Sequence, residues 1–207
     1  MADVVPHLVA HIGAPILDTL FATDAMGASH DFGGYGIVGA DVPHSRVLDS
    51  FRMAHKPGKA VVKLSGDYYG ENNAASPYLR KVPFTRLPEE LFDPSVTQWC
   101  EIACGRWRYE DPIALGESRA VVRLVRGLAA HPQHHRRKVI SLEDNTVTSG
   151  SMAKGRSPAP ALNYLCRLRA ASCLGSQLNL ILPWTETSRM PADEISRVGF
   201  SNRAASA

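Results

Sequence analysis

The stretch TLFATDAMGASHDFGGYGIVGA, residues 19–40, contains two apolar segments on either side of a turn. Residues 19–24 predict a short buried strand that ends on Asp24, and residues 33–40 predict a second strand. The glycines of the second segment indicate a bulge or a close approach of another backbone. The chain therefore opens with a strand pair that carries a carboxylate at its rim.

Strands and helices alternate in the second half of the chain. The expected elements are an edge strand over 97–109, a helix over 112–130, a strand over 139–142, helices ending near 153 and spanning 162–174, a strand over 178–184 and a last short helix near Pro191. This order predicts an α/β fold with a mixed five-stranded sheet flanked by helices. Residues 47–53 favour a helix or a strand, and residues 59–66 a strand.

Residues 41–96 predict a long insertion after the second strand, because their second half is rich in Gly, Pro, Asn and Ser. We expect one domain over residues 1–207, with this insertion inside it.

The bulk composition is that of an ordinary globular protein. Hydrophobic residues make up 44% and charged residues 21% of the 207 residues, which argues against wholesale disorder. No apolar run approaches the roughly 20 residues of a membrane span, and the start lacks the features of a secretory signal. An intracellular location is expected, with cytoplasm and nucleus both open. The four cysteines lack zinc-site spacing and are expected to be reduced.

Four acidic residues stand where a metal site would need them. Asp24 and Asp144 each follow an apolar strand, and Asp193 lies in the first turn of the last helix. Glu117 lies in the apolar arc of the helix over 112–130, one turn before Val121, so it should point toward the sheet. Singly, the aspartates could be helix caps or turn formers, and Glu117 a residue that reaches from the rim to water. Together they match the hard oxygen ligands of a magnesium pair that hydrolyses a phosphodiester.

Four segments carry a family resemblance. Residues 22–40 resemble the first hairpin of ribonuclease H, in which a strand ends in TDAS or TDGS and a Gly-rich strand follows. IALGESRAVVRLV (113–125) resembles the retroelement form of its first helix. SLEDNTVTSGSMAKGRS (141–157) is similar to the strand of its third carboxylate, with a TDN or SDN end, and LILPWTETSRMPADEISR (180–197) to its last strand and an NPADxLSR ending.

The resemblance implies a ribonuclease H-like domain of a retroelement polyprotein of the DIRS-like kind, attached to a reverse transcriptase domain. It implies Asp24, Glu117, Asp144 and Asp193 as catalytic ligands of two Mg²⁺ (or Mn²⁺) ions. The substrate would be an RNA–DNA hybrid whose RNA strand is cut to leave 3′-hydroxyl and 5′-phosphate ends. Asn145, Lys154 and Arg156 are candidate nucleic-acid contacts, although the KGRS segment also fits a plain solvated turn.

Four departures from the family pattern bear on activity. About 92 residues lie between Asp24 and Glu117, and Met26 replaces a common Ser. Residues 185–189 contain no His, and Met190 replaces a usual Asn. We therefore expect slow turnover. Two alternatives stay open: a catalytically impaired ribonuclease H-like module that binds or tethers nucleic acid, and a recombinase or nuclease of the same fold with another substrate.

Overall fold

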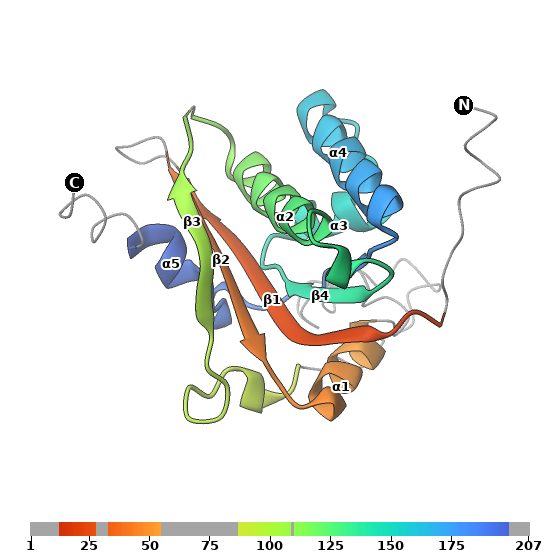
Figure 1. Cartoon of the computed structure of the whole chain (residues 1–207). Coiled ribbons are helices and arrows are strands. Elements are labelled where there is room, and N and C mark those ends of the chain that lie inside the picture. The colour runs from red at the N-terminus through yellow and green to blue at the C-terminus, as the bar shows by residue number, and fades with distance from the viewer. Residues whose placement is uncertain (1–12, 28–32, 55–86, 109, 199–207) are drawn as a thin grey trace, which may run out of the picture.

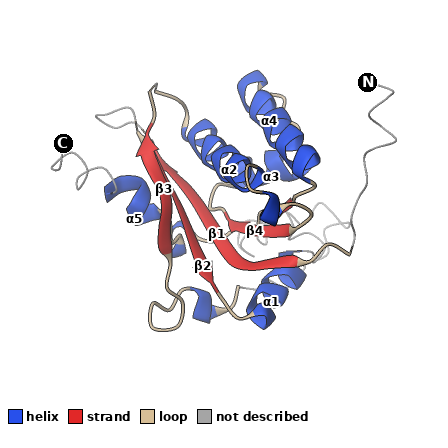
Figure 2. Ribbon diagram, in the orientation of Figure 1, coloured by secondary structure: helices blue, strands red, loops and turns tan. Residues whose placement is uncertain are grey.

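Five strands form one mixed sheet in the order β3-β2-β1-β4-β5. The computed structural model describes residues 13–27, 33–54, 87–108 and 110–198. The strands are β1 (Ile16–Met26), β2 (Gly34–Asp41), β3 (Cys100–Arg106), β4 (Lys138–Leu142) and β5 (Asn179–Ile181). β1 and β3 run antiparallel to β2, whereas β1, β4 and β5 are parallel. The predicted mixed five-stranded sheet is confirmed, and β3 is an edge strand as expected (Figures 1 and 2).

Helices cover both faces of this sheet. One face of β1 packs Leu20 and Ala22 against α1 (His44–Ala54) and α5 (Asp193–Val198). Its other face packs Phe21 against α2 (Ile113–Ala129) and α4 (Pro160–Ser176). This division follows from the strand geometry, since successive side chains of a strand point to opposite faces. A third apolar cluster joins α2, α4 and the short α3 (Thr146–Lys154), which lie together in Figure 1.

The element boundaries shift by a few residues from those expected. β1 begins three residues earlier than residue 19 and continues two residues past Asp24, because Ala25 and Met26 still pair with β2. The last strand is shorter than residues 178–184, and only an isolated bridge between Glu143 and Trp184 extends it. Residues 47–53 belong to a helix, α1.

The described ends of the predicted insertion, residues 41–54 and 87–96, pack into the main core. Val42 and Val47 share a cluster with Leu87 and Leu91, the last of which lies in the single turn η2 (Glu89–Leu91). Residues 55–86 lie outside the described residues, and the expected strand over 59–66 lies there too. The insertion itself stays a prediction.

Two simpler expectations can be checked directly. All four cysteines are free thiols, as predicted. Among the helices of the described residues, none combines the length and the apolar character that a bilayer span requires.

Candidate metal centre

Three acidic side chains meet where β1 and β4 end. Asp24, Glu117 and Asp144 can each place one oxygen within 4.8 Å of the others. β1 and β4 are neighbouring parallel strands, so their carboxyl ends lie at the same edge of the sheet. α2 crosses above β1 and supplies Glu117 from its buried face, on which Val121 also lies.

A glycine sets the distance between α2 and β1. A Cβ atom at Gly116 would lie 3.3 Å from the Cβ of Ala25 and 3.2 Å from Trp107 Nε1. Larger side chains would hold the helix away from the strand. Because Gly116 precedes Glu117, this close packing brings the Glu117 carboxyl over the end of β1.

Hydroxyl and amide groups brace the two carboxyls that face α3. Thr148 Oγ1 donates to Glu117 Oε2 at 3.3 Å, and the side chain of Asn145 also hydrogen-bonds Glu117. Asn145 Oδ1 caps α3 by accepting from the amides of Val147 and Thr148, at 2.8 and 3.2 Å. The hydroxyl of Thr187 hydrogen-bonds Asp144. Asn145, expected to contact nucleic acid, therefore supports the site from within, and its contact with a ligand stays a prediction.

A close approach of α5 to β2 braces the third carboxyl. Ser196 Oγ donates to Asp24 Oδ2 at 2.5 Å. α5 can lie this near because a Cβ at Gly36 would be 2.7 Å from the Ser196 amide nitrogen and 2.8 Å from the Ala192 carbonyl oxygen. The close backbone approach that the glycines of residues 33–40 indicated is thus confirmed at Gly36.

The grouped carboxyls hold their protons unusually strongly. Burial, followed by the charges of Asp144 and Asp24, raises the pKa of Glu117 to about 8. Burial, followed by the charges of Asp144 and Asp193, raises the pKa of Asp24 to about 6. The pKa of Asp144 is raised by burial as well. A cation between these oxygens would reverse all three effects, because it favours the ionised form.

Asp193, the fourth expected ligand, is not part of this three-carboxyl group. Its Oδ1 accepts two hydrogen bonds from Arg197, from Nε at 2.9 Å and from Nη2 at 2.6 Å. Asp193 nevertheless lies near, since its charge raises the pKa of both Asp24 and Asp144. The structure therefore brings three of the four predicted residues together and holds the fourth beside them in an ion pair.

Known proteins give one informative comparison. No family profile and no curated protein matches the sequence. The chain is similar in structure to the N-terminal RNase H domain of Rv2228c from Mycobacterium tuberculosis, solved as a fusion with maltose-binding protein, with a TM-score of 0.50 at 13% identity over 91% of this chain and 96% of that one. The fold is ribonuclease H-like. At this identity the similarity concerns the fold alone.

One acidic residue of this ribonuclease H-like domain escaped the sequence reasoning. Glu143, fully buried beside Asp144, accepts from the Thr23 hydroxyl at 3.4 Å and from the Asn145 amide at 3.3 Å. Burial and then the charge of Glu117 raise the pKa of Glu143 well above its usual range. The sequence does mark this position as unusual, because Glu143 stands where the TDN or SDN motif of ribonuclease H carries Thr or Ser.

In the loop before Asp193, the Met190 side chain does not lie at the site, although the family motif usually has Asn at this position. Met190 is only 5% exposed and packs in the core with Leu91 and Ile181. An Asn at this position would bury an amide among apolar side chains, so Met190 is a core residue and not a lost polar contact of the site. The loop is tied to η2 because Arg189, in the turn η4 (Thr187–Arg189), pairs with Glu89 at 2.7 Å.

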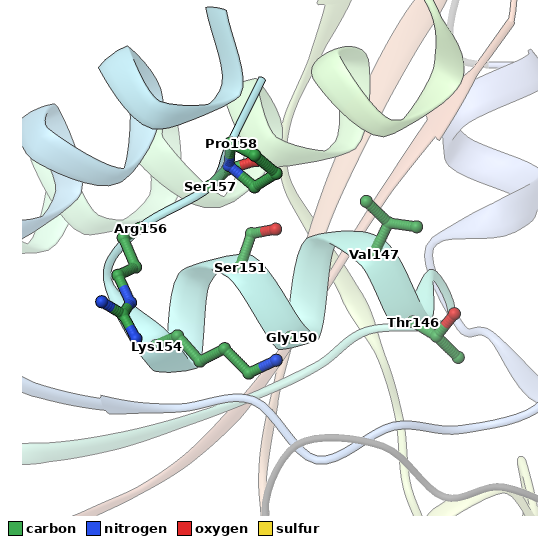
Figure 3. A pocket seen from close by; sticks show the side chains of 8 residues that line it. All are labelled: Thr146, Val147, Gly150, Ser151, Lys154, Arg156, Ser157 and Pro158. Carbon is green, nitrogen blue, oxygen red and sulfur yellow. The ribbon is translucent and has the colours of Figure 1, made fainter. Parts of the chain in front are cut away.

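A groove runs along α3 of this ribonuclease H-like domain. It has a volume of about 570 Å³ and is lined by residues of α3 and of the turn that follows it: Thr146, Val147, Gly150, Ser151, Lys154, Arg156, Ser157 and Pro158. Figure 3 shows Lys154 and Arg156 at the C-terminal end of α3, where Gly155 adopts a left-handed φ of 68°. Both cations are exposed, and neither pairs with a carboxylate among the described residues.

Proposed function

We propose that this chain is a metal-dependent endonuclease that hydrolyses the RNA strand of RNA–DNA hybrids. One observation carries the proposal: Asp24, Glu117 and Asp144 come from three different elements and converge at the carboxyl end of two parallel strands. In open sheets of this kind, ligands are commonly bound outside the carboxyl ends of the strands.

The residues present fit divalent cations. All donors are carboxylate oxygens, the ligands that Mg²⁺ and Mn²⁺ prefer. Asp24, Glu117 and Asp144, joined by Asp193, would hold the two ions, which when bound polarise a phosphoryl oxygen and supply a nucleophilic water. The raised pKa values of the metal-free carboxyls support this reading, because a group of buried like charges needs a counter-charge.

The chain's own polar groups would hold the ligands and the substrate. Thr148 and Ser196 fix the orientation of Glu117 and Asp24. We assign Lys154 and Arg156 to the sugar–phosphate backbone of the bound nucleic acid, because both cations border the groove along α3 and phosphate is the complementary charge.

The biological setting is proposed from motifs alone. The ending PADEISR and the helix segment IALGESRAVVRLV resemble retroelement ribonuclease H domains that adjoin a reverse transcriptase. We infer that a reverse transcriptase domain of the same polyprotein is the partner and that the chain acts inside the cell during replication of such an element.

A second candidate is a nucleic-acid-binding module with impaired turnover. Residues 185–189 of the loop before Asp193 include no His, the side chain that most often moves a proton near neutral pH. Loss of a positioned acid or base typically costs about 10²–10⁴-fold in rate. We therefore propose slow multiple turnover rather than none.

Cleavage by the purified chain tests both candidates. A labelled RNA–DNA hybrid should be cut in the presence of Mg²⁺ or Mn²⁺, whereas duplex RNA and duplex DNA should not be cut. The single-turnover rate of hybrid cleavage should exceed the steady-state rate. Asp144→Asn should abolish cleavage while Asp49→Asn, on α1, should not. Hybrid binding without cleavage would favour the impaired module, and cleavage of duplex DNA would favour a recombinase or nuclease with another substrate.

A further inference from the structure

Arg197 lies on α5, beside the three clustered carboxyls of the candidate metal centre. Its Nε and Nη2 both donate to one oxygen of Asp193, Oδ1. Burial raises the pKa of Asp144, and the positive charge of Arg197 partly offsets that rise, so Arg197 also lies near Asp144. The Arg197 side chain is 58% exposed and that of Asp193 is 32% exposed, so solvent and ligands can reach this ion pair.

We propose that Arg197 binds a non-bridging phosphate oxygen of the substrate, and that Asp193 holds the guanidinium until a divalent cation takes over the Asp193 carboxylate. This role rests on the proposed nuclease function. Asp193 Oδ1 already accepts two N–H groups, so a cation that binds this oxygen must compete with Arg197. The released guanidinium keeps its planar set of donors, which matches the oxygens of a phosphate.

The position of Arg197 separates it from an ordinary helix ion pair. Arg52 and Asp49 form such a pair on α1, with Nη1 3.5 Å from Oδ1 and both side chains exposed. Within the part of the chain that the structure describes, Asp49 belongs to no group of acidic side chains that could hold a metal ion. Asp193, in contrast, acts electrostatically on both Asp24 and Asp144. Arg197 is therefore placed where a phosphate bound at the three carboxyls would come, and Arg52 provides the matched control.

The first arm of the test measures ion binding without nucleic acid. Calorimetric titration of the full chain with Mn²⁺ should show a second ion that binds more weakly than the first. Arg197→Met should tighten this second binding by about two- to fivefold, the range expected when an exposed ion pair stops competing. Arg52→Met should leave it unchanged. Unchanged or weaker Mn²⁺ binding in Arg197→Met would overturn the proposal.

The second arm measures binding of a labelled hybrid by fluorescence anisotropy in Ca²⁺, which carboxylates hold in a more flexible geometry than Mg²⁺ requires. Arg197→Met should weaken hybrid binding by about tenfold, as for a lost charged hydrogen bond. The slope of affinity against salt concentration, on logarithmic scales, should fall by about one, as expected when one phosphate contact is lost. Arg197→Lys should keep the slope but bind less tightly than wild type, because it lacks the planar fork. Equal affinity and slope in wild type and Arg197→Met would refute the phosphate contact.

Neither arm depends on cleavage. A wild-type chain that binds hybrid without cutting it refutes the proposed ribonuclease, while both Arg197 results can still be read. A wild-type chain that does not bind hybrid refutes the substrate and the role of Arg197 together. Melting curves establish that each variant folds. We expect the Arg197 variants to fold, because the Arg197 side chain is exposed.

Discussion

At the scale of single residues, the Asp24 carboxyl depends on a hydroxyl from the other end of the described chain. Ser196 Oγ lies 2.5 Å from Asp24 Oδ2 and 2.8 Å from the carbonyl oxygen of Asp193. This hydrogen bond lowers the pKa of Asp24 against the larger effect of burial. It exists only because α5 lies against the backbone of β2 at Gly36.

Gly36→Ala should loosen this contact. The added methyl would meet backbone atoms of α5 at 2.7 and 2.8 Å, and backbone cannot move aside as a flexible side chain can. We expect a loss of about 1–3 kcal/mol in the free energy of unfolding, the usual cost of overpacking. Urea denaturation measures this loss.

Gly127→Ala is the matched control for that substitution. Gly127 lies within α2, and a Cβ there would have no neighbour within 4 Å. Alanine should raise the free energy of unfolding by about 0.5–1 kcal/mol, because it reduces the freedom of the unfolded chain and favours the helix. Equal effects of the two substitutions would show that α5 is not packed on Gly36 as described.

At the scale of elements, β1, β4 and α2 are held together against the repulsion of the carboxyls that they carry. The pKa of Glu117 rises from 4.5 to about 8 on folding. Between these pH values the folded state binds more protons than the unfolded state, so stability falls as pH rises. The metal-free protein should therefore lose stability from pH 4.5 to pH 8, with Asp24 contributing to the loss below pH 6.

Magnesium should reverse this loss. A cation stabilises the ionised carboxyls, and at a concentration about a hundredfold above its dissociation constant it adds about 2.7 kcal/mol. For a chain of this size the melting temperature should then rise by roughly 5–10 °C. Differential scanning calorimetry with magnesium or with a chelator measures the shift at each pH.

Two variants identify where magnesium acts. Asp144→Asn should remove the magnesium-dependent shift, because it removes one of the three grouped carboxylates. Asp49→Asn, on α1, should keep it. A wild-type melting temperature that does not respond to magnesium would contradict the metal centre.

Elements also set the limit of what the sequence could predict. Glu117 was predictable because helical periodicity alone places it on the buried arc of α2. The ion pair of Asp193 with Arg197 follows from their i,i+4 spacing within α5. Its position beside the three carboxyls and the full burial of Glu143 were not predictable, because they depend on how α5 and β4 pack against other elements. The packing of position 190 was not predictable for the same reason: the motif indicates only that Met190 replaces a usual Asn, whereas the structure buries the Met190 side chain in the core.

At the scale of the whole molecule, basic residues matter by their position more than by their number. The net charge is only +3, yet Lys154 and Arg156 border the groove along α3 and form no ion pair with the carboxylates of the described residues. α3 packs against α2 and α4, and α1 covers the opposite face of the sheet. A nucleic acid that reaches the carboxyls along α3 would pass both cations.

Lys154→Ala and Arg156→Ala should each weaken hybrid binding to a similar degree for all sequences. Each should also lower the slope of affinity against salt concentration by about one, as expected for a lost phosphate contact. Arg52→Ala, on the opposite face, should change neither. Anisotropy titrations over a range of salt concentrations measure both quantities, and an unchanged slope in both groove variants would exclude the groove from the binding surface.

The long sequence separations within the carboxyl centre have a consequence for folding rates. Asp24 and Ser196 are 172 positions apart, and Thr23 and Glu143 are 120 apart. Contacts between such distant segments carry a large loop-closure cost and slow folding. If the centre assembles after the rate-limiting step, its repulsion hardly affects how fast the chain folds but does promote unfolding. A bound cation would then act mainly by slowing unfolding, so it would lengthen the lifetime of the folded chain more than it would speed its formation.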